Sequence, residues 1–410
     1  MLNNISRYSK IVVAFYLLLL LLFSIFSFGL TTPNLILINS SWFSSFQFFM
    51  WERFFNNREL TTAVFASFVL AFFTIYLFLI NSFSKSKTIS IRQQLLLVLL
   101  FCAPLFLSSN MLSNDIFNYI FNSRMIVKYQ ANPHYKTALE FPFDDWTRFM
   151  HNTHTSAPYG YGWTVLSIIP YLTGFGKFST TWLSFRFFTI LSLLLSSIAI
   201  TKLLKAIRKK ELSYYHWALF FLNPLVLLEV INNFHNDLWM MAPAIFSITL
   251  LLNKKKSFFW PIVLYFFSVL IKFSSLALLP VIVLLILKRL GLLEKRKKIS
   301  NFLLNYLPEL SALLMFLPLF TLRSQQFHPW YLLWVLVWIP FIKTQLIKIL
   351  LITFSITSLF RYLPWMLNGE YSQAVLTQQK IITWSAMLLG LMIFGLGIIK
   401  DHLFQTKNVK

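Results

Sequence analysis

Long apolar stretches, separated by short polar segments, follow one another along the whole chain. An α-helix needs about twenty mostly apolar residues to cross the hydrocarbon core of a bilayer, and only a fully hydrogen-bonded backbone is tolerated there. The pattern therefore predicts an all-α, polytopic membrane protein, a bundle of about 12 transmembrane helices. The expected crossings are Ile11–Leu30, Thr61–Ser82, Ile91–Asn110, Thr180–Thr201, Tyr214–Ile231, Leu238–Leu252, Phe258–Ile271, Ser274–Leu287, Phe302–Leu322, Tyr331–Ile342, Leu346–Tyr362 and Ile381–Ile399.

Composition supports a membrane protein. Of 410 residues, 57% are hydrophobic and only 12% are charged, whereas soluble domains carry about 25% charged residues. The net charge of +23 comes mostly from Lys and Arg in short clusters between the apolar stretches. Such clusters report membrane orientation, so we expect membrane lipids, and not nucleic acid, as partners. The single cysteine, Cys102, excludes an intramolecular disulfide.

The basic clusters also predict the topology. Because Lys and Arg are enriched on the cytoplasmic side, their positions place both termini in the cytoplasm of a multi-pass cell-membrane protein. Residues 110–157 then form a long extracytoplasmic loop, which we expect to carry short surface helices. The apolar segment Pro158–Gly176 is short, and a full crossing there would place the basic residues 202–210 outside. We therefore expect Pro158–Gly176 to be re-entrant or to lie on the outer surface.

No internal repeat separates the chain into units, so residues 1–410 are predicted to form one domain. Within it we distinguish two N-terminal helices in residues 1–92, a core in residues 93–345 and C-terminal helices in residues 346–410.

The first candidate for chemistry follows the third predicted crossing. At helical spacing Asp115, Asn118 and Tyr119 share one face, and Asn114 precedes them. One interpretation is a solvated helix at the membrane surface. The other is a catalytic site, in which Asp115 takes a proton from a reacting hydroxyl while Asn114 and Tyr119 help to bind the substrate.

Several further polar residues are predicted on the same outer side. His235 and Asp237 lie in a turn between two apolar stretches and are candidates for orienting a substrate. Two such ligands are too few to indicate a metal site, and no cofactor is expected. Lys272 interrupts an apolar stretch, where its ammonium either snorkels to the surface or pairs with an anion such as a lipid phosphate. Arg323 is a second candidate cation, or an ordinary loop residue.

Two aromatic segments complete the set. His328, Trp330 and Tyr331 form the motif HPWY before an apolar stretch, and Tyr159 lies in PYGYGW. Aromatic residues are common at the headgroup level of membranes, which explains them without a function. Alternatively, His328 donates to a phosphate or sugar oxygen, and the aromatic rings contact a sugar.

Six motifs occur in a fixed order between about Leu95 and Phe341: SNDIFNYIFNSRM, YQANPHY, APYGYGWTVLS, NPLVLLEVINNFHNDLWMM, VLIKFSSLALLP and HPWYLLWVL. In this order they resemble the GT-C superfamily of integral-membrane glycosyltransferases. They are most similar to the bacterial polyprenyl-phosphate-mannose-dependent α-mannosyltransferases. One departure is that two helices precede the helix leading to Asp115, whereas many relatives place the acid after their first helix.

The resemblance implies a GT-C bundle and a glycosyltransferase. It would transfer a sugar, expected to be mannose, from a polyprenyl-phosphate donor to a glycan, glycolipid or protein acceptor on the extracytoplasmic face. The implied reaction inverts the anomeric centre, with Asp115 as general base and His328 as the histidine of the HPWY motif. Lys272 and Arg323 would hold the leaving phosphate. His235 and Asp237 match an HND element whose role stays open.

Two other functions fit a polar outer face. A transporter or flippase of a lipid-linked saccharide should show internal pseudo-symmetry and polar residues at mid-membrane, and neither is evident. A polymerase or ligase of envelope glycans is the second alternative, because such enzymes also have large extracytoplasmic loops.

Overall fold

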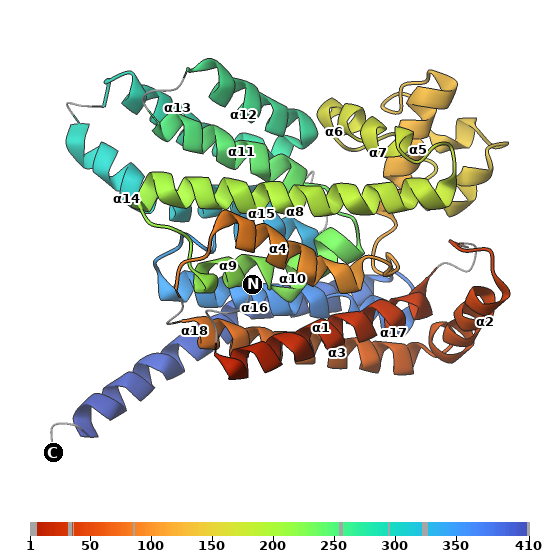
Figure 1. The fold of residues 1–410 in the computed structure, drawn as a ribbon, viewed down its shortest axis with the longest axis horizontal. Helices are drawn as coiled ribbons and strands as arrows, with labels where there is room; N and C mark the ends of the chain where they lie inside the picture. Colours follow the sequence, from red (N-terminus) through yellow and green to blue (C-terminus); the bar gives the residue numbers. More distant parts are fainter. Residues whose placement is uncertain are drawn as a thin grey trace.

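The computed structural model describes residues 6–31, 35, 37–84, 87–253, 257–293, 296–321 and 327–407, with side chains described up to Ile398. These residues form helices and connecting loops, and no strand is found in these ranges. The all-α prediction is therefore confirmed (Figure 1). The α-helices are α1 (Arg7–Ser27), α2 (Ser41–Met50), α3 (Arg58–Phe83), α4 (Ile91–Cys102), α5 (Asp115–Tyr129), α6 (Tyr161–Leu166), α7 (Ile168–Leu172), α8 (Phe178–Arg208), α9 (Tyr214–Phe221), α10 (Pro224–Val226), α11 (Asp237–Leu252), α12 (Phe259–Ile271), α13 (Leu279–Arg289), α14 (Lys297–Phe316), α15 (Leu333–Leu336), α16 (Gln345–Phe360), α17 (Leu363–Asn368) and α18 (Gln373–Lys407).

Among the described residues, 6 helical segments are long and apolar enough to cross a membrane, or up to 7 if the bent pair of α9 with Pro224–Asn232 is one span. The six are Arg7–Leu30, Arg58–Phe83, Phe178–Arg208, Lys297–Phe320, Gln345–Asn368 and Gln373–Ile398. Three shorter apolar helical segments, Ile91–Leu105, Asp237–Leu252 and Phe259–Ile271, coincide with predicted crossings. A membrane protein is thus supported, whereas the predicted count of twelve crossings is not confirmed.

One predicted crossing is not a continuous helix. The segment Tyr331–Ile342 consists of the 3₁₀ turn η11 (Pro329–Leu332), the four residues of α15 and further turns. Its side chains from Leu332 to Ile342 are buried inside the protein. Irregular backbone at membrane depth is tolerated where protein surrounds it, and that condition is met here.

Most long helices lie side by side along the longest dimension of the molecule, with α8 running through much of its length (Figure 1). At one end, on the right of that view, α2, α5, α6, α7 and α17 gather, and the C-terminal end of α18 lies at the opposite end. The helices α6 and α7 have 6 and 5 residues and are too short to span a bilayer, since a helix rises 1.5 Å per residue. The structure accordingly shows no full helical crossing within Pro158–Gly176.

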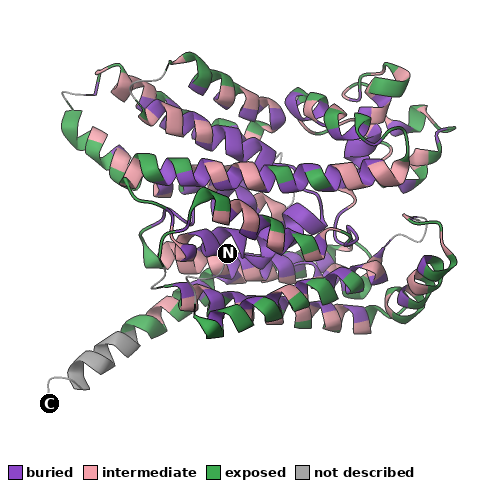
Figure 2. Cartoon of the chain, viewed as in Figure 1, coloured by how far each residue is buried: buried purple, intermediate pink, exposed green. Residues whose placement is uncertain are grey.

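Burial divides the bundle into an inner and an outer set of helices. Buried residues dominate α9, α10, α11 and α15, whereas α1, α12 and α18 expose many apolar side chains (Figure 2). Exposed apolar helix faces suit contact with lipid.

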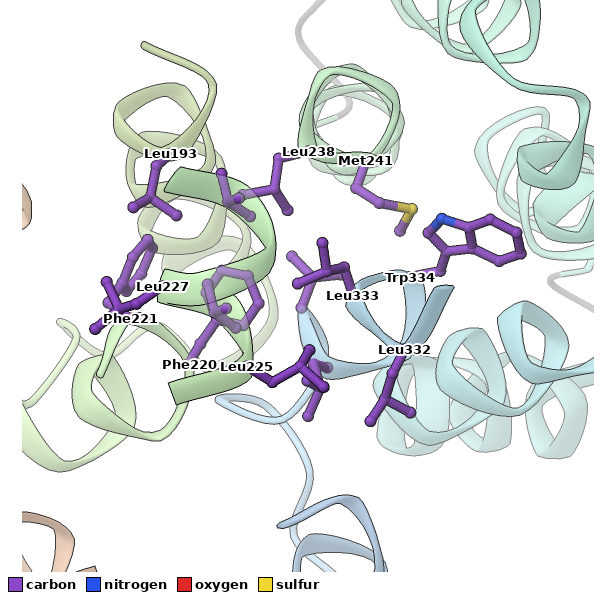
Figure 3. Packing of buried hydrophobic residues seen from close by; sticks show 14 of the residues in the cluster. Leu193, Phe220, Phe221, Leu225, Leu227, Leu238, Met241, Leu332, Leu333 and Trp334 are labelled. Atoms are coloured by element: carbon purple, nitrogen blue, oxygen red, sulfur yellow. The ribbon is translucent and has the colours of Figure 1, made fainter. Parts of the chain in front are cut away.

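The core is one large cluster of buried apolar side chains. Figure 3 shows Phe220 and Leu225 from α9 and α10 near Leu333 of α15, with Met241 of α11 beside Trp334. The segment from Pro329 to Leu336 is therefore embedded between helices of the middle part of the chain, such as α10 and α11, and the later helices α14 and α16. This embedding brings the HPWY motif to the residues described next.

Candidate active site

Asp115 is the first residue of α5, one of the helices that gather at one end of the molecule (Figure 1). A helix N-terminus stabilises a carboxylate through its free N–H groups and its dipole. The following residues of the polar face, Asn118 and Tyr119, are buried, as is most of α5. A solvated interfacial helix is therefore the wrong interpretation of this stretch: its polar face is turned into the protein, and the Asp115 side chain is only 19% exposed.

Tyr159 reaches Asp115 from a different segment. Its hydroxyl donates a hydrogen bond of 2.7 Å to Oδ2 of Asp115. The neighbouring glycines make this possible, because a Cβ on Gly160 would lie 2.0 Å from the carbonyl oxygen of Leu270 in α12. Gly160 also donates its N–H to the carbonyl of Ile271 at 3.1 Å. The PYGYGW motif thus lets the start of α6 dock closely on the end of α12.

Lys272 follows the last residue of α12 and enters the same region. Its Nζ lies 2.7 Å from Oδ1 of Asp237, at the start of α11, and the indole N–H of Trp334 donates to the same oxygen. The Lys272 side chain is 11% exposed and that of Asp237 is fully buried. Lys272 therefore pairs with a protein carboxylate while keeping part of its ammonium accessible.

His235 lies behind Asp115. Its Nδ1 is 3.8 Å from Oδ2 of Asp115, and its Nε2 is 3.2 Å from Oε2 of Glu229. Glu229 is itself buried and accepts hydrogen bonds from Asn233 and Tyr362, each at 3.0 Å. The three ionisable groups form a row that runs from the buried Glu229 to the accessible Asp115.

An unusual backbone produces this row. Glu229 lies in a π-helical segment, η6 (Leu227–Asn232), and Phe234 adopts a left-handed conformation with φ of 62°. Both features cost free energy and are concentrated at functional sites. The guanidinium carbon of the buried Arg186 lies 3.8 Å from the centre of the Phe234 ring, and Arg186 donates to the carbonyl of Ser108. Arg186 thereby ties the HND turn to the segment that leads into α5.

The HPWY motif supplies an aromatic wall. The Trp330 ring stacks on His235 at 3.9 Å on one side and on His328 at 4.4 Å on the other, between ring centres. Tyr331 stacks on Trp334 at 4.6 Å. The motif therefore contacts the HND turn directly and is not simply an aromatic belt facing the headgroups.

These elements surround a cavity of about 590 Å³. It is lined by Asp115, Asn152, Pro158, Tyr159, Gly160, Lys272, Phe273, Ser274, Ala277, Pro318, Thr321, His328, Trp330, Tyr331 and Trp334. Six of the residues predicted from the sequence thus line one cavity: Asp115, Tyr159, Lys272, His328, Trp330 and Tyr331.

The other predicted residues lie elsewhere. His235, Asp237 and Tyr119 are buried behind the cavity walls, and Asn114 precedes α5 outside the lining. Arg323 lies outside the described residues.

Sequence reasoning did not predict Asn152 or Trp334 as part of this region. Asn152 carries no local signal, because it lies in an irregular loop. The sequence does predict Glu229 as a member of the polar cluster, since it lies near the outer end of an apolar stretch, where a carboxylate is costly unless it is paired.

Partial burial shifts the pKa values of two side chains that line the cavity, His328 and Tyr159. It lowers the pKa of His328 to about 4, although the nearby Asp115 carboxylate opposes this shift. Burial, followed by the charge of Asp115, raises the pKa of Tyr159 well above its usual value. At neutral pH His328 is therefore uncharged, and Tyr159 keeps the proton that it donates to Asp115. Within the described ranges, no group of three or more His, Cys, Asp or Glu side chains is arranged to hold a metal ion.

Comparison with known proteins identifies the family. The family described as alpha-(1->6)-mannopyranosyltransferase, N-terminal domain (MptA_B family), matches residues 19–288. The match includes Asp115, Tyr159, His235, Asp237 and Lys272 and ends before the HPWY motif. No curated protein and no solved structure matches the chain. Because the family match covers well over half of the chain and agrees with the resemblance of its motifs to GT-C mannosyltransferases, the protein belongs to the alpha-(1->6)-mannopyranosyltransferase family.

Proposed function

We propose that the protein transfers mannose from a polyprenyl-phosphate donor to an acceptor hydroxyl on the extracytoplasmic face, with inversion and with Asp115 as general base. One observation carries this proposal: a carboxylate, Asp115, and a cation, Lys272, from distant segments line the same cavity. A glycosyl transfer from a phosphate needs a base for the acceptor and a positive charge for the leaving group. Family membership supports a mannosyltransferase over a flippase or a polymerase.

The cavity walls fit a lipid-linked donor. On one side the lining residues Phe273 and Ala277 come from η7 (Phe273–Leu278), and Pro318 comes from η9 (Leu317–Phe320). These residues are apolar and belong to the helices with exposed outer faces, so a prenyl chain would reach the cavity laterally from the bilayer. The donor phosphate would then lie at Lys272.

Lys272 does not act as an isolated charge, because Asp237 pairs with it. Its contribution to phosphate binding comes from the ammonium hydrogens that Asp237 does not use, since a lysine carries three donors. The ion pair of Lys272 with Asp237 carries no net charge. Arg323, predicted from the sequence as a second cation, would supply a net positive charge to the phosphate.

In the proposed step, the acceptor oxygen forms a bond to the anomeric carbon as the bond from that carbon to the phosphate oxygen breaks. The electron pair leaves with the polyprenyl phosphate, and the acceptor proton passes to Asp115. Tyr159 holds the Asp115 carboxylate in place through its hydrogen bond, with His235 packed behind it, while the neutral His328 hydrogen-bonds to the donor sugar or phosphate. Asp237 positions Lys272 in the same way.

The test is a transfer assay with purified protein in lipid. Radiolabelled polyprenyl-phosphate mannose and a mixed envelope-glycolipid acceptor fraction are supplied to the wild type, to Asp115→Asn and to Asp145→Asn. Asp145 is exposed and lies outside the cavity lining, so it is the matched control. We expect transfer by the wild type and the control and its loss in Asp115→Asn by a factor of about 10²–10⁴.

Other outcomes separate the parts of the proposal. Full transfer by Asp115→Asn would leave the enzyme class standing and remove Asp115 as base. If the wild type transfers neither mannose nor glucose nor arabinose from such donors, the flippase alternative gains weight. Use of only the β-linked donor to make an α-linked product would support inversion.

The face of the membrane can be tested separately. Phe143 is 99% exposed, and the loop that contains it also contains Asn152 of the cavity. A single cysteine from Phe143→Cys, in a Cys102→Ser background, should react with a membrane-impermeant maleimide added to the extracytoplasmic side. Labelling from the cytoplasmic side alone would refute the proposed orientation.

A further inference from the structure

A second cavity adjoins the first. It has a volume of about 560 Å³ and is lined by His134, His154, Thr155, Ser156, Ala157, Pro158, Tyr159, Gly160, Tyr161 and Phe273. Four of these residues, Pro158, Tyr159, Gly160 and Phe273, also line the cavity that contains Asp115. The two cavities therefore share one wall, and Tyr159, the hydrogen-bond donor to Asp115, is part of it.

The two cavities differ in their chemistry. The first contains Asp115 and Lys272, whereas no Asp, Glu, Lys or Arg occurs among the described residues that line the second. Hydroxyl groups, aromatic rings and two histidines line it instead. Burial lowers the pKa of His134, so that this side chain is neutral at physiological pH. An uncharged, hydroxyl-rich ligand suits such a lining better than a phosphate does.

Its aromatic side chains form a platform. The rings of His134 and Tyr161 lie 4.0 Å apart between their centres, at an angle of 33°. Nε2 of His134 is 2.9 Å from the hydroxyl oxygen of Thr164, which holds the imidazole in place. Tyr161 stays 48% exposed although it packs against His134. Exposed rings that are held in position can stack against the C–H face of a sugar ring at little cost in conformational entropy.

The two cavities are lined mainly by different segments of the chain. The lining of the second cavity comes mainly from the loop before α6, predicted to be extracytoplasmic, whereas the apolar part of the first cavity lies at η7 and η9. A lipid-linked donor in the first cavity and a carbohydrate acceptor in the second would thus meet at the shared wall.

We propose that this second cavity is the acceptor site and that it binds a neutral mannoside on the platform of His134 and Tyr161. The bound mannoside extends one hydroxyl past Tyr159 to Asp115. This inference rests on the proposed function, because only a transferase needs a separate acceptor site beside the donor cavity.

The first experiment measures steady-state kinetics of mannose transfer. Tyr161→Ala and His134→Ala are compared with Phe143→Ala, which removes an exposed aromatic side chain of the same loop outside both cavities. We expect the acceptor KM to rise roughly tenfold in the first two variants, since a stacking contact contributes up to about one factor of ten in affinity. Donor KM and the rate at saturating acceptor should stay unchanged, and Phe143→Ala should behave as wild type.

An unchanged acceptor KM in Tyr161→Ala, or a rise in donor KM instead, would overturn the inference. A Tyr161→Phe variant guards against misfolding, because it keeps the ring and should keep the acceptor KM within about twofold of the wild-type value.

A second experiment does not depend on turnover. Binding of α-(1→6)-mannobiose is measured by saturation-transfer NMR to Asp115→Asn protein, alone and combined with Tyr161→Ala or Phe143→Ala. Binding that Tyr161→Ala weakens and Phe143→Ala leaves intact supports the acceptor site, even if the transfer assay were to fail. Absence of mannobiose binding, or its displacement by inorganic phosphate, would contradict a neutral carbohydrate site.

Discussion

The Tyr159 hydroxyl and Oδ2 of Asp115 lie 2.7 Å apart, although 44 positions separate the two residues in the chain. The contact exists because Gly160 allows the start of α6 to approach the backbone of Leu270 at the end of α12. The next residues after α12 include Lys272. The proposed base and the proposed phosphate ligand are therefore positioned by the same helix contact.

Removing the Tyr159 hydroxyl should slow the reaction without unfolding the protein. A hydrogen bond to a charged group contributes about 1.5–3 kcal/mol, so we expect Tyr159→Phe to lower the transfer rate roughly tenfold or more. The exposed Tyr8→Phe on α1, far along the chain from the site, is the control. Transfer kinetics at saturating substrates measure the effect, and a wild-type rate in Tyr159→Phe would show that this hydrogen bond does not position the base.

The close approach of α6 and α12 can be tested with glycine substitutions. A Cβ on Gly160 would lie 2.0 Å from a backbone oxygen, whereas a Cβ on Gly395 in α18 would meet nothing within 4 Å. Gly160→Ala should therefore destabilise the protein by about 1–3 kcal/mol and lower transfer at least tenfold by displacing Tyr159. Gly395→Ala should have the melting temperature and activity of the wild type, or slightly higher stability. Equal melting temperatures and rates for both variants would refute the importance of this contact.

Lys272 and Asp237 should differ in their effects on stability and on donor binding. Lys272→Gln leaves the fully buried Asp237 without its cation, and breaking a buried pair costs about 3–5 kcal/mol. It should also raise the donor KM about tenfold or more, because a charged contact to phosphate is lost.

The double variant Lys272→Gln/Asp237→Asn separates these effects. It removes both charges, so most of the lost stability should return while the donor KM stays high. Thermal melting in detergent and donor saturation curves provide the two measurements. Recovery of donor affinity in the double variant would mean that Lys272 is only a partner of Asp237.

The stability of the protein should depend on the protonation of His328. Its pKa is about 4 in the folded protein, against an ordinary value of 6.5, because the half-buried side chain loses much of its contact with water. The unfolded chain therefore binds one more proton than the folded chain between these pH values. The contribution of His328 is fully present above pH 6.5 and is lost as the pH falls toward 4, by about 3 kcal/mol in total.

His328→Gln should flatten this dependence. Melting temperatures of the wild type and the variant, measured from pH 7 to pH 4, are compared as differences, since the other histidines are common to both proteins. Parallel curves for the two proteins would contradict the burial of a neutral His328.

Much of the site was predictable from local patterns. Apolar stretches indicate a membrane protein because the bilayer requires them, and six described segments meet the length and composition required of a span. Asp115, Lys272 and the HPWY motif were conspicuous, since polar groups within or beside apolar stretches need partners. The order of the motifs also pointed to the family that the comparison identifies.

Hydropathy could not distinguish a helix in lipid from a segment buried in protein. Tyr331–Ile342 is as apolar as a crossing, yet it forms irregular turns inside the bundle. The same limit explains why the predicted count of twelve crossings exceeds the number of long helices found among the described residues.

The sequence by itself determined that the chain is helical and apolar and which polar residues require an explanation. Only the tertiary structure decided how these residues are divided: Asp115, Tyr159, Lys272 and His328 line a cavity, while His235 and Asp237 lie behind it as their partners. The physical reason is that periodicity and hydropathy describe only local structure, over a few turns of a helix. Contacts such as that of His235 with Asp115 depend on packing between distant segments, here on the π-helical turn and on the left-handed Phe234 held by Arg186.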